Sequence, residues 1–407
     1  MTDTTCEVVA GVDTHADTCW AALVDTAGHH IDDQQFRADP AGYQALVEFI
    51  TSHGTLLRVG VEGTSSYGAG LTRVLAARGI PTAEVTRPAR TTRRRGKSDP
   101  IDAYAAAAAA LADNELPVPK TLDQVTGMIR PLLIARRSAV KAAAEATQQI
   151  HSLLVTAPDQ IREPYRHLDT KTLIKQLSQL PPPVRPDTGA DAFRLALHTL
   201  ATRIIALHNQ ADRLETELDR LTIAANPALA GSFGIGPVTA AQLLVTAGDN
   251  PTRMRSQACF AMLIGVCPIP ASSGKTTRHR LNRHGDRQGN AAIEHIAFIR
   301  ARYDPDTKDY LARLAARGKT DREAIRCLKR AIARQVWHLL THPDQAPDTT
   351  SLRALRQARH ATLAQASTAL HVDPTAISRL ERGLKADTRL ANRYHDWLTT
   401  PQPNLTK

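Results

Sequence analysis

The sequence predicts an α/β domain at the N-terminus, then long coiled-coil helices and two further, mainly helical domains. Hydrophobic residues make up 42% of the 407 residues and aromatic residues only 4%. Abundant alanine and leucine favour helix over an all-β fold. Apolar positions follow a strand-like pattern early in the chain and a helical period afterwards. A chain of this length has room for two or three domains with cores of their own.

Residues 1–118 show the alternation of an α/β layered domain. Three β-type runs separated by short turns indicate a meander. The order is three strands, a helix, a strand, a helix, a strand and a helix, over residues 7–13, 18–25, 31–39, 40–50, 56–63, 68–79, 80–87 and 99–111. This order fits an RNase H-like domain.

Two long helices are expected over residues 119–225. The first covers residues 127–160 and is broken by Pro158, and a proline-rich break follows at 180–186. In the second, apolar residues recur in alternating steps of four and three, the seam of a coiled coil, at Phe193, Leu197, Leu200, Ile204, Leu207, Ala211, Leu214, Leu218 and Leu221. The seam indicates self-association or pairing with helix 127–157; the alternative is one helix buried in an intramolecular bundle.

Charge divides the chain unevenly. The formal net charge is +11, yet residues 1–70 hold ten acids and two cations, a net charge of −8, which leaves +19 for the rest. Residues 251–340 alone hold eighteen Lys or Arg against seven acids. An acidic segment ahead of a basic remainder indicates a metal site beside a nucleic-acid surface. A solvated acidic face is the simpler alternative.

Four carboxylates of the first domain form a candidate metal site. Asp13 ends the first strand, Glu62 ends the fourth, and Asp99 and Asp102 share one face at the start of a helix. Hard oxygen ligands suit Mg²⁺ or Mn²⁺, and two such ions can clamp a phosphodiester. Taken singly, such an aspartate could be a turn residue or, at Asp99, a helix N-cap.

A basic loop precedes Asp99. Six cations fall within eleven residues, at Arg87, Arg90, Arg93, Arg94, Arg95 and Lys97. Such a loop attracts backbone phosphates, although a basic loop without a fixed role would look the same.

Two segments of the second half offer phosphate contacts. Residues 232–249 resemble half of a helix-hairpin-helix, in which Gly234 and Gly236 would present backbone N–H groups; a plain tight turn is the alternative. Further on, Ser272 and Ser273 precede Gly274. Cations follow at Lys275, Arg278, Arg280, Arg283 and Arg287. A serine needs activation to act as a nucleophile, so from chemistry alone this loop could equally be a turn or a phosphate contact.

In order along the chain, these motifs resemble the insertion-sequence-110 family of transposases over residues 7–340. The most specific segments are KSDPIDA at 97–103, and the Ser-Gly-Lys segment with RLNRHGD after it. The family commonly has a Leu-Arg pair next, where this chain has Arg287 to Asn290.

The resemblance implies a RuvC-like domain over 1–118 and a transposase domain over 226–342. It assigns Asp13, Glu62, Asp99 and Asp102 to a D-E-D-D metal set and Ser273 to the nucleophile, with Ser272 as the alternative register. It also implies donor and target DNA, a structured bridge RNA as guide, and a homo-oligomer (dimer or tetramer) whose catalytic domains come from different subunits.

A linker at 343–350 and a small all-helical tail at 351–400 extend beyond the family core. The tail resembles a helix-turn-helix of the phage-repressor type, with LAQASTAL, a turn and PTAISRLERG. Arg379 and Arg382 are its candidate DNA contacts. A helical hairpin used only for packing is the alternative.

Compartment and function follow from these patterns. Five cysteines without a C-x-x-C pair suit a reduced, cytoplasmic protein without structural zinc. Neither a signal peptide nor a membrane span is expected. The predicted function is a transposase that cuts and rejoins DNA through a serine–phosphate intermediate. The alternatives are a RuvC-like nuclease that uses metals alone and a non-enzymatic repressor.

Overall fold

The computed structural model describes residues 6–85, 98–272, 274, 279–343, 351–382 and 387–400. Two compact units are present. Unit 1 is Met1–Leu122 with Ala247–Arg255, and unit 2 is Asp123–Thr246 with Ser256–Lys407. Several predicted site residues lie outside the described residues, together with most of the linker: Arg87, Arg90, Arg93, Arg94, Arg95, Lys97, Ser273, Lys275 and Arg278.

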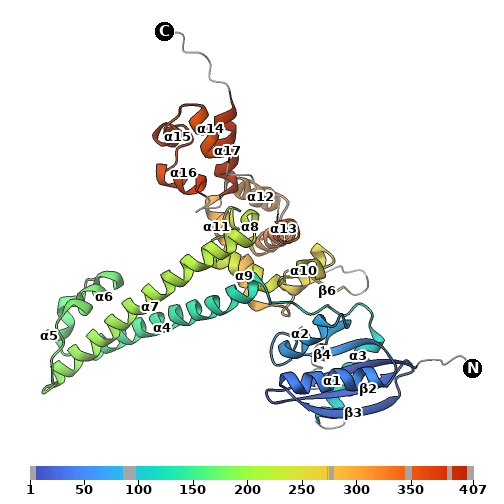
Figure 1. Cartoon of the computed structure of the whole chain (residues 1–407). Coiled ribbons are helices and arrows are strands. Elements are labelled where there is room, and N and C mark those ends of the chain that lie inside the picture. The colour runs from blue at the N-terminus through green and yellow to red at the C-terminus, as the bar shows by residue number, and fades with distance from the viewer. Residues whose placement is uncertain are drawn as a thin grey trace, which may run out of the picture. The chain divides into compact units, whose positions relative to one another are not determined.

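Unit 1 is built on a five-stranded mixed sheet (Figure 1). Its strands are β1 (Glu7–Thr14), β2 (Thr18–Asp25), β3 (His30–Arg37), β4 (Thr55–Glu62) and β5 (Thr82–Val85). They lie in the order β3-β2-β1-β4-β5. The first three form the predicted antiparallel meander, whereas β4 runs parallel to both β1 and β5. The predicted alternation of strands and helices is confirmed.

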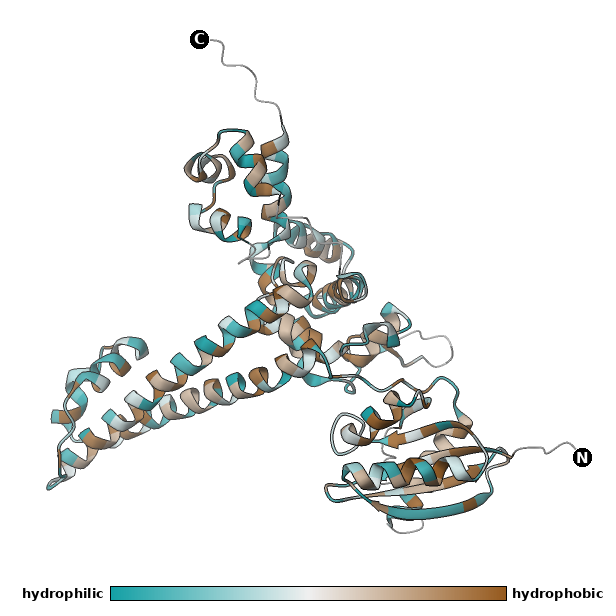
Figure 2. Cartoon of the chain, viewed as in Figure 1, coloured by the Kyte–Doolittle hydropathy of each residue, from teal (hydrophilic) through white to brown (hydrophobic). Residues whose placement is uncertain are grey.

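Helices cover both faces of this sheet. Helices α1 (Pro40–Ser52) and α2 (Ala69–Ala77) pack against one face, where Leu46 and Leu71 join Val8 in a buried cluster. Helix α3 (Asp99–Ala112) packs against the other face, where Ala107 contacts the cluster of Val9. Strand β1 is therefore buried on both sides, while the edge strand β3 is largely exposed and hydrophilic (Figure 2).

The longest elements of unit 2 are two paired helices, α4 (Val125–Thr156) and α7 (Gly189–Ala225). Short helices α5 (Asp159–Arg162), η2 (Glu163–Tyr165) and α6 (Thr170–Gln179) connect them. Alanines of α4 pack against the predicted seam of α7 in one buried cluster. The seam positions buried in α7 include Leu197, Ile204, Ala211, Leu218 and Leu221. Pairing between the two long helices, one of the predicted outcomes, is confirmed.

The rest of unit 2 is almost entirely helical. Before residue 344 it contains α8 (Pro227–Ala230), α9 (Pro237–Ala247), α10 (Gln257–Leu263), the strands β6 (Ile269–Pro270) and β7 (His279–Arg280), α11 (Arg287–Tyr303), α12 (Pro305–Ala316) and α13 (Asp321–Thr341). The short helix η3 (Pro251–Arg253) and the last residue of α9 belong to unit 1. The tail contains α14 (Leu352–Ala358), α15 (Leu363–Leu370), α16 (Pro374–Glu381) and α17 (Thr388–Thr399). Among the described residues, no helix combines the length and the hydrophobicity needed to cross a membrane.

Candidate functional site

Neighbouring strands bring two of the predicted carboxylates to one edge of the sheet. Strands β1 and β4 are parallel, and Val12 pairs with Val61. Asp13 and Glu62 follow these two residues, so both lie at the same end of the sheet. The Thr14 hydroxyl donates a hydrogen bond of 2.8 Å to the backbone oxygen of Glu62 and ties the two strand ends together.

Helix α3 brings the other two carboxylates to this edge, because two glycines leave room for its backbone. A Cβ atom at Gly11 of β1 would lie 2.1 Å from the backbone nitrogen of Ala107. One at Gly60 of β4 would lie 2.6 Å from the carbonyl oxygen of Ala106. The helix thus lies directly on the strands, and its first turn carries Asp99 and the buried Asp102.

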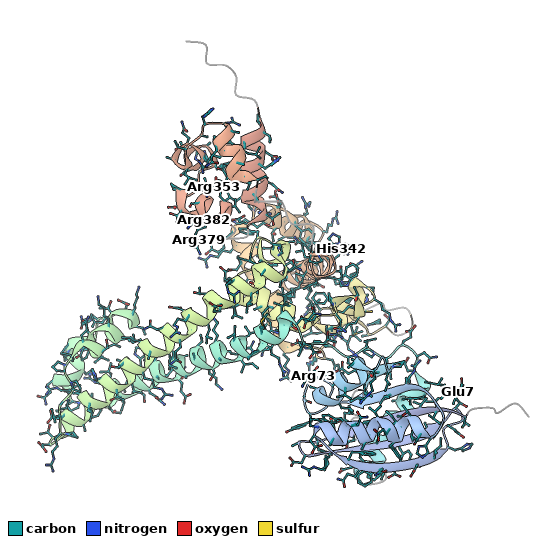
Figure 3. The ribbon with its side chains drawn as sticks, in the orientation of Figure 1. Glu7, Arg73, His342, Arg353, Arg379 and Arg382 are labelled. Carbon is teal, nitrogen blue, oxygen red and sulfur yellow. The ribbon has the colours of Figure 1, made fainter. Side chains whose placement is uncertain are left out.

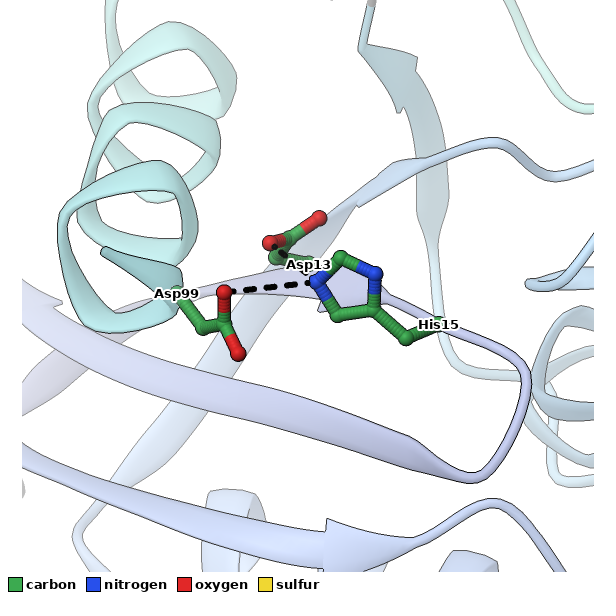
Figure 4. Close-up of side chains that lie close together, drawn as sticks. All are labelled: Asp13, His15 and Asp99. Carbon is green, nitrogen blue, oxygen red and sulfur yellow. Dashed lines mark ion pairs between the residues drawn. The ribbon is translucent and has the colours of Figure 1, made fainter. Parts of the chain in front are cut away.

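An imidazole that the sequence analysis missed lies between two of these acids (Figure 4). The Nε2 atom of His15 is 3.2 Å from Oδ2 of Asp13 and 3.4 Å from Oδ1 of Asp99. The side chain of Asp13 is only 1% exposed, whereas those of His15 and Asp99 are 32% and 38% exposed. One ligand atom from each of the three lies within 4.8 Å of the others. Carboxylate oxygens around an imidazole form a donor set suited to a divalent cation.

We call Asp13, Glu62, Asp99, Asp102 and His15 the acidic edge. Within the described residues, the close group of ligand atoms contains Asp13, His15 and Asp99 and does not include Glu62 or Asp102. The four-carboxylate metal set therefore stays a prediction, and His15 is an addition to it.

The negative charge of the acidic edge contributes to a raised pKa of a neighbouring thiol, that of Cys19. Cys19 of β2 pairs with Thr14 of β1 and is fully buried. Burial, followed by the negative charge of Asp13, raises the pKa of Cys19 to about 11. The thiol is therefore protonated at neutral pH and cannot act as a nucleophile there.

In unit 2, a short β-ladder brings together the ends of the serine-containing segment. Ile269 pairs with Arg280, and Pro270 pairs with His279. The segment 271–278 thus starts and ends at one place. Of its described residues, Ser272 and Gly274 are exposed, and Gly274 has a φ of 55°. Backbone of this left-handed kind favours glycine.

This ladder borders a cavity of about 750 Å³, which we call the basic cavity. Asp286 is the one acid among the described residues that line it. Both oxygens of Asp286 are engaged, by the backbone N–H groups of Gln288 and Gly289 and by the Thr246 hydroxyl. The cations that line the cavity are Arg280, Arg283, Arg287, Arg326, Lys329, Arg330 and Arg334. The excess of positive charge suits a phosphate-bearing ligand.

The sequence analysis missed the cations that α13 contributes. Arg330 and Arg334 are oriented by hydrogen bonds to Gln257, at 3.3 and 2.8 Å. Lys329 donates to Asn290 and Glu294. Arg326 lines the same cavity without an ion pair to any described residue. Cations recur along α13 at helical spacing. This pattern is also typical of a solvated helix face, so the sequence did not indicate that these side chains line a cavity.

Within the described residues, the remaining predicted nucleic-acid contacts before residue 344 are three arginines and two glycines. Arg280, Arg283 and Arg287 all line the basic cavity, so a cation is retained where the family's Leu-Arg pair is replaced. Gly234 has a φ of 83°, and Arg300 donates to the neighbouring Phe233 carbonyl at 2.8 Å. Gly236 precedes α9, and a Cβ atom there would meet nothing within 4 Å. Phosphate contact at these glycines stays a prediction.

Comparisons with known proteins match two segments of the chain. A family model described as a transposase, for the DEDD domain of IS110 elements, matches residues 10–157. A second model, for the transposase IS116/IS110/IS902 family, matches residues 226–312. The two models together span more than half of the chain.

Two relatives are similar over part of their length. The insertion element IS110 uncharacterized 43.6 kDa protein of Streptomyces coelicolor is 35% identical over 153 residues, 36% of each chain. The insertion element IS900 uncharacterized 42 kDa protein of Mycobacterium paratuberculosis is 28% identical over 123 residues, 30% of this chain and 31% of that protein. The chain thus matches about a third of the length of each relative. With both domain models matched in the expected order, the chain belongs to the IS110 family of transposases.

Proposed function

We propose that this protein is a DNA recombinase that moves an insertion sequence by cutting and rejoining DNA strands. One observation carries the proposal: the chain contains both an acidic edge suited to cations, in unit 1, and a basic cavity suited to phosphate, in unit 2. The strand order β3-β2-β1-β4-β5 supports assignment of unit 1 to the RNase H-like, RuvC-like group.

The residues of the acidic edge fit a divalent cation, Mg²⁺ or Mn²⁺. Asp13, His15 and Asp99 offer ligand atoms within 4.8 Å of one another, and Glu62 and Asp102 lie at the ends of elements that meet there. When bound, such a cation stabilises charge on phosphodiester oxygens. The packing of α3 on Gly11 fixes the carboxylates before the cation arrives, which lowers the cost of binding it.

The chemical step assigned to Ser273 conserves phosphodiester bonds. Its Oγ atom attacks the scissile phosphorus and forms a phosphoserine bond to the DNA 5′ phosphate. The bond to the 3′ oxygen breaks, and the serine proton ends on that oxygen through solvent. Reversal with a new 3′ hydroxyl rejoins the strand, so no ATP is required. Arg280 and Arg283, which follow the serine segment and line the basic cavity, neutralise the phosphate charge.

The partners we propose are donor and target DNA, a structured guide RNA and further copies of the chain. The net charge of +11 supports polyanionic partners. Helix α4 pairs with α7 yet leaves Ile134 and Val140 exposed. These side chains are available for contact with a second copy.

The test is to trap the covalent intermediate on a nicked oligonucleotide duplex. The wild-type protein and Ser272→Ala should give an adduct that protease digestion and mass spectrometry assign to Ser273. Ser273→Ala should bind the duplex and give none. Strand cleavage by Ser273→Ala without an adduct would instead establish the metal-only nuclease.

A further inference from the structure

The tail, residues 351–400, is a compact helical domain beyond the segments that the family models match. Its four helices share a buried cluster that includes Leu352, Ala366, Ile377 and Tyr394. This cluster gives the tail a scaffold of its own, on which a surface helix can be held in a fixed orientation.

Helices α15 and α16 are joined by a turn of three residues. His371 begins the turn with a left-handed backbone, at a φ of 52° and a ψ of 48°. The Ser367 hydroxyl donates a hydrogen bond of 2.6 Å to the carbonyl of Val372. Asp373 caps α16 by accepting from the backbone N–H of Thr375, and Pro374 occupies its first turn. The sequence here builds a helix-turn-helix, in which the second helix is presented outward.

Helix α16 has one face in the core and one in solvent. Ile377 and Leu380 are fully buried, whereas Thr375 and Arg379 are exposed. Its last residue, Glu381, accepts two hydrogen bonds from Arg356, at 2.7 and 2.9 Å, and one from the Tyr394 hydroxyl, at 2.7 Å. Burial opposes ionisation of Glu381, but these bonds outweigh it and hold the pKa of the carboxyl below its ordinary value. A charged, buried anchor therefore fixes the exposed face of α16.

The arginines of the tail divide into two groups. Three of them hold the domain together: Arg356 with Glu381, Arg359 with the Trp397 ring, and Arg393 with the Leu370 carbonyl. A fourth, Arg389, pairs with Asp304 outside the tail. The remaining three, Arg353, Arg379 and Arg382, belong to α14 and to α16 with its C-terminal cap (Figure 3). Arg382 donates a hydrogen bond of 3.2 Å to the Ser378 carbonyl of its own helix.

None of these three arginines forms an ion pair with a described residue. Two electrostatic relations involve them: Arg379 lowers the pKa of Asp219 in α7, against a larger rise caused by burial, and Arg353 contributes to the lowered pKa of Glu381. The exposed face of α16 is thus cationic, and one carboxylate outside the tail competes weakly for Arg379.

We propose that the tail binds duplex DNA by placing α16 in the major groove. Thr375 and Arg379 would face base edges, while Arg353 and Arg382 would contact the flanking phosphates. The major groove of B-DNA admits one α-helix, whereas that of A-form RNA is too narrow for side chains to read. This activity goes beyond strand transfer, because it gives the chain a surface that reads DNA sequence directly.

The test uses the full chain and a pool of random duplexes of about 20 base pairs, selected for binding. The wild-type protein should enrich one sequence. Arg379→Ala should lose about tenfold or more in affinity for the enriched duplex and little for a random one, as expected for a base contact. Arg353→Ala should weaken both and lower the salt slope by about one.

Two matched variants separate recognition from packing. Asp219→Asn, which removes the competing carboxylate, should raise affinity about twofold to threefold; a purely structural tail would not respond in this direction. Arg322→Ala, which replaces an exposed arginine of α13 that is not among the residues lining the basic cavity, should change neither affinity.

Absence of an enriched sequence, or equal binding by Arg379→Ala, would overturn the proposal and leave the tail as a packing hairpin. Equal binding to an RNA duplex of the enriched sequence would overturn the choice of DNA. Adduct formation at Ser273, measured on a nicked duplex without that sequence, is a separate readout, so failure of the recombinase assignment would be seen independently.

Discussion

The acidic edge and the basic cavity gather like charges in opposite ways. In unit 1, carboxylates lie on strand ends and on a helix packed directly against them, and Asp13 is almost completely buried. In unit 2, cations lie on long side chains around a cavity of about 750 Å³, and only some are held by hydrogen bonds. Since charge repulsion grows as solvent is removed, we expect the acidic edge to depend on a rigid scaffold and on the cation proposed for it. We expect the basic cavity to depend on neither.

This difference predicts unequal responses to single substitutions. We expect the loss of one carboxylate to disrupt the whole acidic edge, because its ligand atoms hold fixed positions. The loss of one arginine should remove only part of the positive potential of the basic cavity.

The largest effect is expected for Asp13→Asn, which keeps the shape of the side chain and removes its charge. Strand cleavage in Mg²⁺ should fall at least about a thousandfold, because a preorganised electrostatic contact is lost at the reacting centre. Thermal melting should be retained. The matched change in the basic cavity, Arg326→Ala, should cost less than about tenfold. Equal losses would remove the distinction between the two sites.

Gly11→Ala should break the scaffold of the acidic edge rather than its chemistry. The new Cβ would lie 2.1 Å from a backbone nitrogen and 2.2 Å from a backbone oxygen of α3, so the helix must shift. Overpacking of this kind costs about 3 kcal/mol of the free energy of unfolding. Calorimetric melting and metal titration would show both losses.

Gly189→Ala is the control for that substitution, since a Cβ there meets nothing within 4 Å. A Gly11→Ala protein with unchanged melting would show that α3 does not rest on β1 as described.

Salt dependence should distinguish the basic cavity from the acidic edge. Each of Arg280→Ala, Arg283→Ala and Arg326→Ala should reduce the slope of log affinity against log salt by about 0.9 for duplex DNA. Asp13→Asn should leave that slope unchanged. Fluorescence anisotropy between roughly 50 and 200 mM salt would measure both. A slope that is unaffected by all three arginine substitutions would place the nucleic acid elsewhere.

The sequence predicted those parts of the sites that local patterns encode. Asp13 and Glu62 could be placed because each ends a short apolar run, and Asp99 with Asp102 because their spacing fits one helix face. His15 could not be placed, since it lies beyond the end of β1 and nothing local shows which way the chain turns there.

The cations of α13 were missed for a related reason. They reach the basic cavity only through the packing of α13 against α10 and α11.

The role of Gly11 also lies outside local patterns. Within a strand, glycine usually weakens the sheet, and only the approach of α3 explains why a side chain is excluded. The seam of α7 predicted an apolar partner, yet its periodicity could not choose between α4 and a second copy, because both present the same kind of surface.

His15→Ala should change which cation the acidic edge prefers. An imidazole nitrogen is a better ligand for Mn²⁺ than for Mg²⁺, whereas carboxylates serve both. We therefore expect affinity for Mn²⁺ to fall several-fold and affinity for Mg²⁺ to change less, as measured by isothermal titration calorimetry. Equal changes for the two ions would show that His15 positions the carboxylates without binding the cation.

The smallest effect is a change in thiol reactivity that reports the local field. With a pKa of about 11, Cys19 is protonated at pH 8.5 and buried, so iodoacetamide should label the exposed Cys6 and Cys259 first. Asp13→Asn removes the negative charge that contributes to the raised pKa of Cys19, but it leaves burial, the larger cause, in place. Labelling of Cys19 should therefore accelerate modestly and stay slow.

The control is Cys267, which lines the basic cavity and should keep its labelling rate in the same variant. Mass spectrometry of the labelled peptides between pH 7 and 10 would measure all four rates. Acceleration at Cys267 equal to that at Cys19 would mean that Asp13→Asn loosens the whole chain instead of removing a local negative charge.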